Sequence, residues 1–385
     1  MMAEPTVDRV TLRREIARDL GMPFFRIFPS GITIQDSATS GLANASDSTK
    51  IKDSRFQQKA DYWKNTWVYN VTTGEQRRTV DFIQDQKALM PEYNWTTTPT
   101  TAHTIEIFSI HTAEEVHNAI NDAIRDGFPV FFDIVTYENI IIEDEKLEYT
   151  FSNNSDGRGF LTNPYRIKSV WMEQITSGGT HSVTSAASTV LANTAETFSG
   201  VDTTWSIGVY KGTGAGQYIV PTSGSSAGII TVPAMTVVPD TTSEFRLWKR
   251  TEELYSWYPI TDIEFDAKDY PGLMRLLHSR PADVGLRMRI QYVQEPQPLA
   301  TDTASTAVPR QYIRHRALAK LMRQRARTHP AERSKYAELA TDEERQADKF
   351  KIEHGFDLPD QTIWQEKNWG TLQVPEFNPL DWGGR

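Results

Sequence analysis

The sequence contains no cysteine. Disulfide bonds, thiolate metal sites and cysteine nucleophiles are therefore excluded, and the core must be held by packing and polar contacts alone. No run approaches the roughly 20 apolar residues that a membrane-spanning helix needs. The opening residues MMAEPTVDRV also lack the apolar segment of a signal peptide. These absences predict a protein that is made and kept in a cytoplasm and has no membrane partner.

The sequence has fewer basic than acidic residues: it contains 41 Lys and Arg and 50 Asp and Glu, which gives a formal net charge of −9. Such a balance argues against nucleic-acid binding over the whole surface, although a local basic stretch can still bind. The hydrophobic fraction of 38% is modest, but 10 Trp, 14 Tyr and 17 Phe supply apolar area in large rigid units. With 385 residues, the chain is expected to form two or three cores.

Recognisable catalytic motifs are missing as well. The glycine-rich residues 212–216 precede a strand-like run rather than a helix, which predicts a hairpin turn and not a phosphate-binding loop. The acidic residues at 143–145 and 262–266 lack calcium-loop spacing, the eight histidines form no zinc motif, and residues 179–183 lack a Gly-x-Ser-x-Gly elbow. We therefore expect no catalytic, cofactor or metal site and no enzymatic activity.

Four long helices are expected, besides a short one described below. Residues 8–21 place Leu12, Ile16 and Leu20 on one face. Thr112 and Glu115 form a capping box ahead of an apolar stripe that ends at residue 127. Residues 309–328 and 330–354 follow later in the chain, the second opening on a proline suited to a first helical turn.

Strand-like runs occupy much of residues 128–293. The clearest are 130–135, 166–172, 260–265 and 286–293, which are rich in Val, Ile, Tyr and Trp. A short helix is predicted at 270–278, and the Pro-rich residues 295–306 are predicted to be an extended linker.

An ungapped shift of 140 residues aligns two parts of the chain. It matches Gly74 with Gly214, Trp67 with Ile207 and Trp95 with Met235, and it aligns a Pro-x-Thr turn in both copies. This pattern predicts an internal duplication of a small antiparallel β-module, with these turn glycines equivalent and the four large apolar side chains inside.

A basic stretch without any acid is the first candidate interaction site. Its cations are Arg310, Arg314, Arg316, Lys320, Arg323, Arg325 and Arg327. Apolar residues among them leave one helix face for packing. The stretch predicts contact with DNA or an acidic partner; the alternative is an exposed face neutralised by the mixed-charge helix that follows.

The aromatic tail, residues 356–385, is the second candidate. It carries Trp364, Trp369, Phe377 and Trp382 without helical or strand periodicity. Exposed aromatic side chains are costly unless they are buried against something. The tail is expected to dock either on its own subunit or on a neighbouring one.

Together these patterns predict an α+β protein in which a small helical bundle carries two inserted antiparallel β-modules and an extended C-terminal tail. The bundle would comprise residues 1–36, 109–127 and 307–355. The first β-module would span 37–108, a β-domain would span 128–300 with the second module at about 176–248, and the tail would span 356–385.

The helical segments resemble head-to-tail adaptor (connector) proteins of tailed bacteriophages. The resemblance rests on Thr11-Leu12-Arg13-Arg14-Glu15-Ile16-Ala17, on the capped Glu-Glu-Val-x-x-Ala-Ile helix, and on the terminal pair containing Tyr336-Ala337-Glu338-Leu339. The Gly-Thr-Gly-Ala-Gly-Gln-Tyr-Ile run is similar to β-modules of phage neck and tail proteins. The large β-regions depart from the adaptor pattern.

The resemblance implies a virion protein that forms a dodecameric ring beneath the portal, between the portal and a tail, stopper or nozzle protein. Such a ring would line the exit channel of double-stranded DNA, without sequence specificity, and would be assembled in the host cytoplasm. The alternatives are another virion ring, such as a tail tube, stopper or baseplate component, or a carbohydrate- or receptor-binding β-protein.

Overall fold

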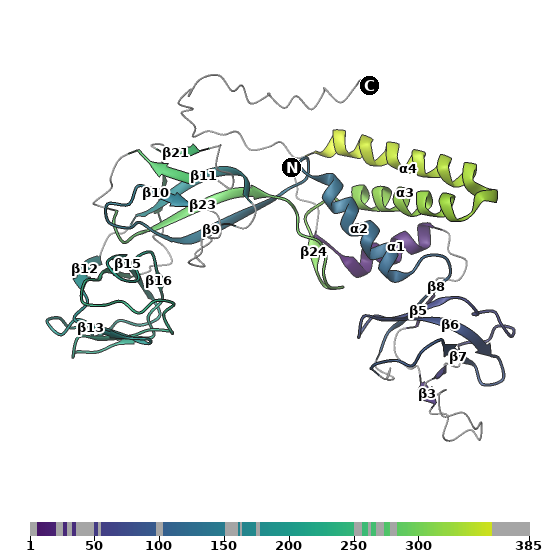
Figure 1. The fold of residues 1–385 in the computed structure, drawn as a ribbon, viewed down its shortest axis with the longest axis horizontal. Coiled ribbons are helices and arrows are strands. Elements are labelled where there is room, and N and C mark those ends of the chain that lie inside the picture. The colour runs from purple at the N-terminus through teal and green to yellow at the C-terminus, as the bar shows by residue number, and fades with distance from the viewer. Residues whose placement is uncertain are drawn as a thin grey trace. The chain divides into compact units, whose positions relative to one another are not determined.

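The computed structural model describes residues 6–20, 26–28, 33–35, 50–52, 55–97, 103–150, 161, 164–174, 178–249, 256–260, 263–266, 273–277 and 283–355. They divide into two compact units (Figure 1). The first holds the described residues of Met1–Asp133 and Glu295–Leu358, and the second holds those of Ile134–Gln294.

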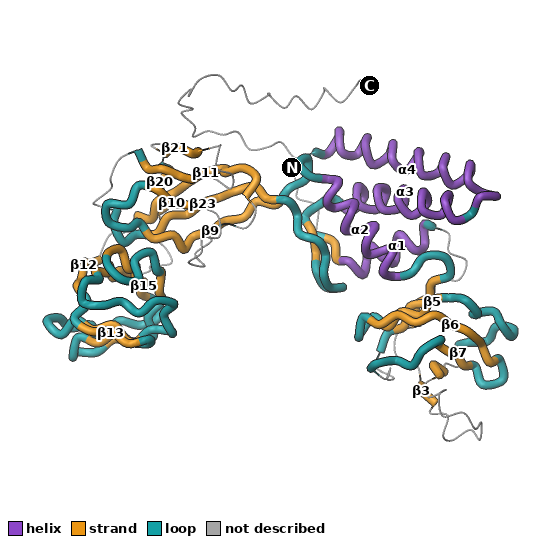
Figure 2. The backbone as a smooth tube through the Cα atoms, viewed as in Figure 1, coloured by secondary structure: helices purple, strands orange, loops and turns teal. Residues whose placement is uncertain are grey.

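The expected fold class, an α+β protein in which a small helical bundle carries two inserted antiparallel β-modules, is wrong. The structure is mostly antiparallel sheet: among the described residues, the strands hold more residues than the four α-helices (Figure 2). The physical reason is long-range pairing, which a residue pattern does not reveal. The helix predicted at 270–278 illustrates it, because Leu273–Leu276 is a strand, β22, paired on both sides by β10 and β21.

The four long helices expected from the sequence are present. They are α1 (Arg9–Asp19), α2 (Ala113–Gly127), α3 (Arg310–Thr328) and α4 (Arg333–His354), the last preceded by a 3₁₀ turn, η2 (Pro330–Glu332). The capping box of α2 is confirmed, since Glu115 N–H donates to Thr112 Oγ1 at 3.0 Å and Thr112 N–H donates to Glu115 Oε2 at 2.8 Å. No described helix has the length and apolar character to cross a membrane.

These helices form one core in the first unit. Leu12, Ile120, Ile313 and Leu318 are buried together where α1, α2 and α3 meet. The predicted linker is extended but docked on this core: Leu299 is buried, and its N–H donates to Asn121 Oδ1 at 2.8 Å. Farther along, β24 (Ser305–Thr306) pairs with β1 (Val7–Asp8). Residues 295–306 are thus part of the helical layer.

The first β-module packs against that layer through a seven-stranded sheet of order β2-β8-β5-β6-β7-β4-β3. Its strands are β2 (Arg26–Phe28), β3 (Thr33–Gln35), β4 (Lys50–Lys52), β5 (Trp67–Asn70), β6 (Glu75–Ile83), β7 (Ala88–Pro91) and β8 (Ile105–Phe108). Strands β2 and β3 lie before residue 37, so the module begins within the stretch that was predicted to belong to the helical bundle. The edge strands β2 and β3 are separated by only residues 29–32, and four residues span at most roughly 15–18 Å. The sheet therefore has to curl until its two edges approach each other.

The second unit contains two sheets that share a core. The first has the order β20-β11-β23-β9 and the second β10-β22-β21, and Ile140, Met172, Met274 and Ile290 are buried between them. The strands are β9 (Asp133–Ile141), β10 (Glu148–Thr150), β11 (Pro164–Gln174), β20 (Ser256–Pro259), β21 (Ile263–Asp266), β22 (Leu273–Leu276) and β23 (Arg287–Gln294).

The second β-module, also in this unit, is built from two four-stranded sheets around a common core. They are ordered β12-β19-β15-β16 and β13-β14-β18-β17. The strands are β12 (Gly178–Ser182), β13 (Ser185–Ala187), β14 (Val190–Ala192), β15 (Trp205–Lys211), β16 (Tyr218–Ile219), β17 (Ser223–Gly224), β18 (Ile229–Thr231) and β19 (Glu244–Lys249). The glycine-rich residues 212–216 form the turn between the antiparallel strands β15 and β16, as predicted.

The two modules share one strand order. In the second module, β16 and β17 can be taken as one interrupted strand that corresponds to β6. The order is then β12-β19-β15-(β16/β17)-β18-β14-β13, which matches β2-β8-β5-β6-β7-β4-β3 of the first module strand by strand. Equivalent cross-strand pairs recur: Val68 with Ile107 corresponds to Ile207 with Leu247, and Ile51 with Leu89 corresponds to Leu191 with Ile230. All eight side chains are buried, as expected for a duplicated module.

The ungapped shift fails by one residue at β5. Val68, not Trp67, is the counterpart of Ile207, so the two are 139 positions apart, whereas Ile107 and Leu247 are 140 apart. A slip of one residue turns a strand's side chains to the opposite face. Trp67, predicted to lie inside, is consequently half-buried on the outer face, against the helical core. Trp95 and Ile207 are buried inside their modules, and Met235 is partly buried against the second module's core.

Candidate functional site

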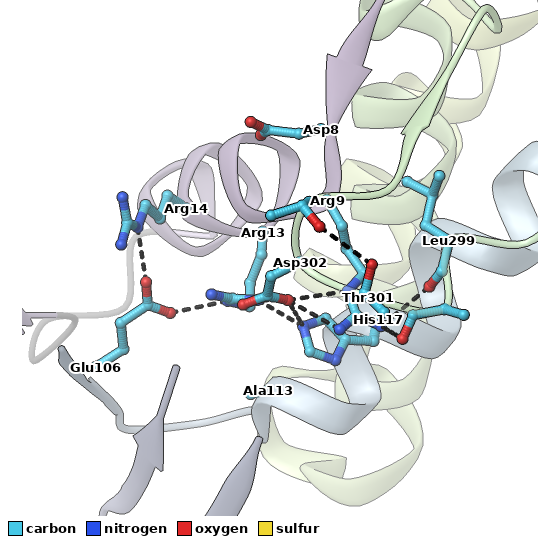
Figure 3. Close-up of polar contacts among 12 residues, drawn as sticks. Asp8, Arg9, Arg13, Arg14, Glu106, Ala113, His117, Leu299, Thr301 and Asp302 are labelled. Atoms are coloured by element: carbon cyan, nitrogen blue, oxygen red, sulfur yellow. Dashed lines mark hydrogen bonds and ion pairs between the residues drawn. The ribbon is translucent and has the colours of Figure 1, made fainter. Parts of the chain in front are cut away.

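A buried polar cluster lies where α1, α2, β8 and residues 299–302 meet (Figure 3). At its centre, the fully buried Arg13 donates from Nε to Glu106 Oε2 at 2.8 Å and from Nη1 to Asp302 Oδ1 at 2.6 Å. Arg14 donates from Nε to the other oxygen of Glu106 at 2.6 Å. Both carboxylates therefore bind guanidinium groups of α1.

Asp302 connects this cluster to the segment that precedes α3. Arg9 donates from Nε to Asp302 Oδ1 at 3.0 Å and from Nη1 to the carbonyl oxygens of Leu299 and Ala300, each at 2.9 Å (Figure 3). Burial by itself would raise the pKa of Asp302, but hydrogen bonds from Arg13 and Arg9 outweigh it and hold the pKa below its usual value. The carboxylate stays ionised and clamps the segment onto α1.

His117 of α2 completes the cluster. Its Nε2 lies 2.8 Å from Arg13 Nη1, and its ring packs edge-on against Tyr69, with centroids 5.7 Å apart. Burial, together with the charges of Arg13 and Arg9, lowers the pKa of His117 to about 3. The imidazole is therefore neutral at physiological pH and accepts a hydrogen bond from Arg13.

The contacts of this buried polar cluster hold segments of the fold together. His117 is not a proton donor near neutral pH, and Asp302 and Glu106 are both occupied by guanidinium groups. What the cluster does is join four segments that are distant in sequence, from residue 9 to residue 302. A buried ion pair of this kind favours one arrangement strongly, because separating the partners leaves a charge without compensation.

The second unit has a comparable buried ion pair. Arg287 of β23 donates from Nε and Nη2 to the Glu173 carboxylate of β11 at 3.0 and 2.9 Å, and Trp248 Nε1 donates to the same carboxylate at 3.2 Å. Trp248 lies on β19, the counterpart of β8. Both modules therefore dock through the same face of the same two strands. In the first, Glu106 of β8 is a member of the buried ion pair, whereas in the second Trp248 of β19 donates to an ion pair of the neighbouring sheet.

The basic helix predicted as an interaction site is α3. Four of its cations face acids of α1 and α2: Arg310 pairs with Glu15, Arg314 with Asp19 at 2.5 Å, Arg316 with Asp126 at 3.1 Å, and Lys320 with Asp126 at 3.0 Å. Farther along, Arg323 pairs with Glu344 of α4, and Arg325 lies 3.9 Å from Glu332. Among the residues that the structure describes, Arg327 has no ion-pair partner, and it is exposed.

The aromatic residues predicted to anchor the tail lie outside the described residues. Trp364, Trp369, Phe377 and Trp382 all fall in this segment, which begins at residue 356. Their role in docking stays a prediction.

Sequence reasoning missed the buried cluster, although a signal was present. Glu106 is the single acid in the apolar run Ile105-Glu106-Ile107-Phe108, and all four residues are buried. An ionisable residue in such a run needs a partner of opposite charge. The identity of that partner, Arg13, could not be inferred, because 93 residues separate the two.

Neither metal-binding geometry nor similarity to known proteins assigns a function to the described residues. Within the described residues, no group of three or more His, Asp or Glu side chains is placed to hold a metal ion. Comparisons of the chain with protein-family models, curated proteins and solved structures find no significant match.

Proposed function

We propose that this protein is a structural component of a tailed-phage particle, a head-to-tail adaptor that assembles into a ring with further copies of itself. The proposed neighbours are a portal protein on one side and a tail or stopper protein on the other. The residue resemblance in α1, α2 and α4 suggests this setting.

The observation that carries the proposal is the exposed side of α4. This helix is 22 residues long, yet its only buried residues are Ala340 and Ala347, which form a narrow seam toward α3. Leu339 is 39% exposed and Ile352 is 85% exposed, and at about 100° per residue they lie on the two flanks of this seam rather than on one face. In Figure 1 α3 and α4 run side by side as a long hairpin. A long helix packed along one narrow seam leaves a surface available for a second copy.

The test is the mass of the purified full chain, measured by native mass spectrometry and sedimentation. The unmodified protein should form a closed ring, and the double variant Leu339→Asp with Ile352→Asp should shift it toward monomer, because charges would then lie in the contact. A control places Asp at Val80 and Tyr93, which are also exposed large hydrophobic residues, at 39% and 69%, but lie in the first β-module. A ring that survives the α4 changes, or is lost in the control, contradicts this assignment.

Deletion of residues 356–385 tests the tail separately. The truncated chain is expected to remain folded, as judged by its circular dichroism and melting, but to lose ring formation or incorporation into particles. If the truncated chain is incorporated normally, the tail docks only on its own subunit.

A further inference from the structure

The turn between α3 and α4 concentrates positive charge. Residues 323–335, termed here the hairpin tip, contain five cations, Arg323, Arg325, Arg327, Arg333 and Lys335, against one acid, Glu332. The whole chain carries a net charge of −9. The tip is therefore a local basic patch on an otherwise acidic protein.

The ion pairs of α3 are distributed unevenly along the helix. Its first four cations are engaged by acids of α1 and α2, as described above. Toward the tip, Arg327, Arg333 and Lys335 are exposed and have no ion-pair partner within the described part of the chain. The charge left for an outside partner lies at the end of the hairpin rather than along α3.

The tip also lacks what a protein partner would need. Protein interfaces are built around apolar and aromatic residues with a polar rim. No large hydrophobic side chain between residues 323 and 335 is exposed, and Tyr336 at its edge is covered by the Arg325 guanidinium, 4.5 Å from the ring centroid. Exposed arginines and small polar residues instead suit phosphate oxygens, which arginine can bind bidentately.

We infer that the hairpin tip binds the phosphate backbone of double-stranded DNA without sequence specificity, through Arg327, Arg333 and Lys335. The biological setting rests on the proposed function, since a neck ring surrounds the DNA path. Contacts to phosphate alone carry no sequence information, so affinity is expected to depend on salt and not on base composition.

The experiment measures binding of a fluorescent 30-base-pair duplex to the full chain by anisotropy, at several salt concentrations between about 50 and 200 mM. The variant Arg327→Gln, Arg333→Gln, Lys335→Gln should bind at least about tenfold more weakly at the lowest salt. Each phosphate contact contributes about −0.9 to the slope of log K against log salt, so the slope should become shallower by roughly 2–3. Duplexes rich in A·T and in G·C should bind alike.

A matched control removes three exposed cations elsewhere, Lys59→Gln, Lys64→Gln and Arg125→Gln, with the same change in net charge. It should retain the affinity and the salt slope of the unmodified chain. Equal losses in both variants would show a net-charge effect and overturn the inference. Two other results would overturn the inference: a tip variant that keeps the DNA affinity of the unmodified chain, or a polyglutamate peptide that binds the tip more tightly than DNA does.

Ring mass is recorded on the same samples. If the unmodified chain forms no ring but binds DNA, and the tip variant loses this binding, the result supports DNA binding by the tip and contradicts the adaptor assignment. A ring that forms normally but never binds the duplex would contradict the tip alone.

Discussion

Arg13 has no solvent exposure, yet it carries a full positive charge beside two carboxylates. In a low-dielectric interior such a group is tolerated because Glu106 and Asp302 compensate it, with the face of Tyr69 4.8 Å away. Burial lowers the pKa of His117 most, and the charge of Arg13 lowers it further, so this arginine affects both the packing and the titration of its neighbour.

His117 gives a prediction for the pH dependence of stability. Its pKa is about 3 in the folded protein against an ordinary value of 6.5, so between these values the unfolded chain binds one more proton. The contribution is fully present above pH 6.5 and is lost as the pH falls toward 3. The free energy of unfolding should therefore decline by at most about 1.4 kcal/mol per pH unit on account of this residue.

The measurement is urea unfolding at pH 6.5, 5.75 and 5.0 for the unmodified chain and for His117→Gln. The carboxylates and the other histidines are common to both proteins, so the difference between the two profiles reports on His117. The unmodified chain should lose more stability across it than the variant does. Parallel pH profiles would show that His117 does not titrate as described, whatever the absolute stability of the variant.

At the scale of elements, register decides what each module presents outward. Trp67 and Tyr69 face the helical core from β5, whereas on β15 the outward position beside Arg246 is Gly208. A Cβ at Gly208 would lie 2.2 Å from the Gly285 carbonyl oxygen and 3.1 Å from Ile141 Cδ1. The absence of a side chain therefore lets the second module approach the turn before β23.

Replacement of Gly208 by Ala should loosen this docking, because a backbone oxygen cannot move aside as a flexible side chain can. We expect a loss of about 1–3 kcal/mol in the free energy of unfolding. A change in the near-ultraviolet signal of the docked Trp248 should accompany it. Thr231→Ala, exposed on β18, is the control. If both variants behave alike, the close approach does not contribute to stability.

Local chemistry was predictable from the sequence where it is self-contained. The Thr112 capping box and the proline at the start of η2 act within a few residues, and both were located correctly. Strand β22 was mistaken for a helix because its character comes from β10 and β21, and β10 lies more than a hundred residues earlier. The acids that neutralise α3 were equally remote, since Glu15 and Asp19 each precede their arginine by 295 residues.

At the scale of the whole molecule, the second unit is an insertion into the first. The chain leaves the first unit at Asp133 and returns at Glu295. The two crossing strands, β9 and β23, are neighbours in one sheet. Each unit has its own buried core, so each is expected to fold without the other.

Excision tests this expectation. Residues 134–294 expressed alone, and the remaining chain closed by a short Gly-Ser linker between residues 133 and 295, should each unfold cooperatively in calorimetry. Their melting temperatures should match two transitions of the full chain. An excised second unit that melts without a cooperative transition would show that it depends on the first.

The double crossing has a mechanical consequence. A pull between the two units would load two backbone segments at once, because β9 and β23 leave and re-enter the first unit as hydrogen-bonded neighbours. A single cut at either crossing would still leave one covalent tether, whereas a domain on an ordinary single linker would be released.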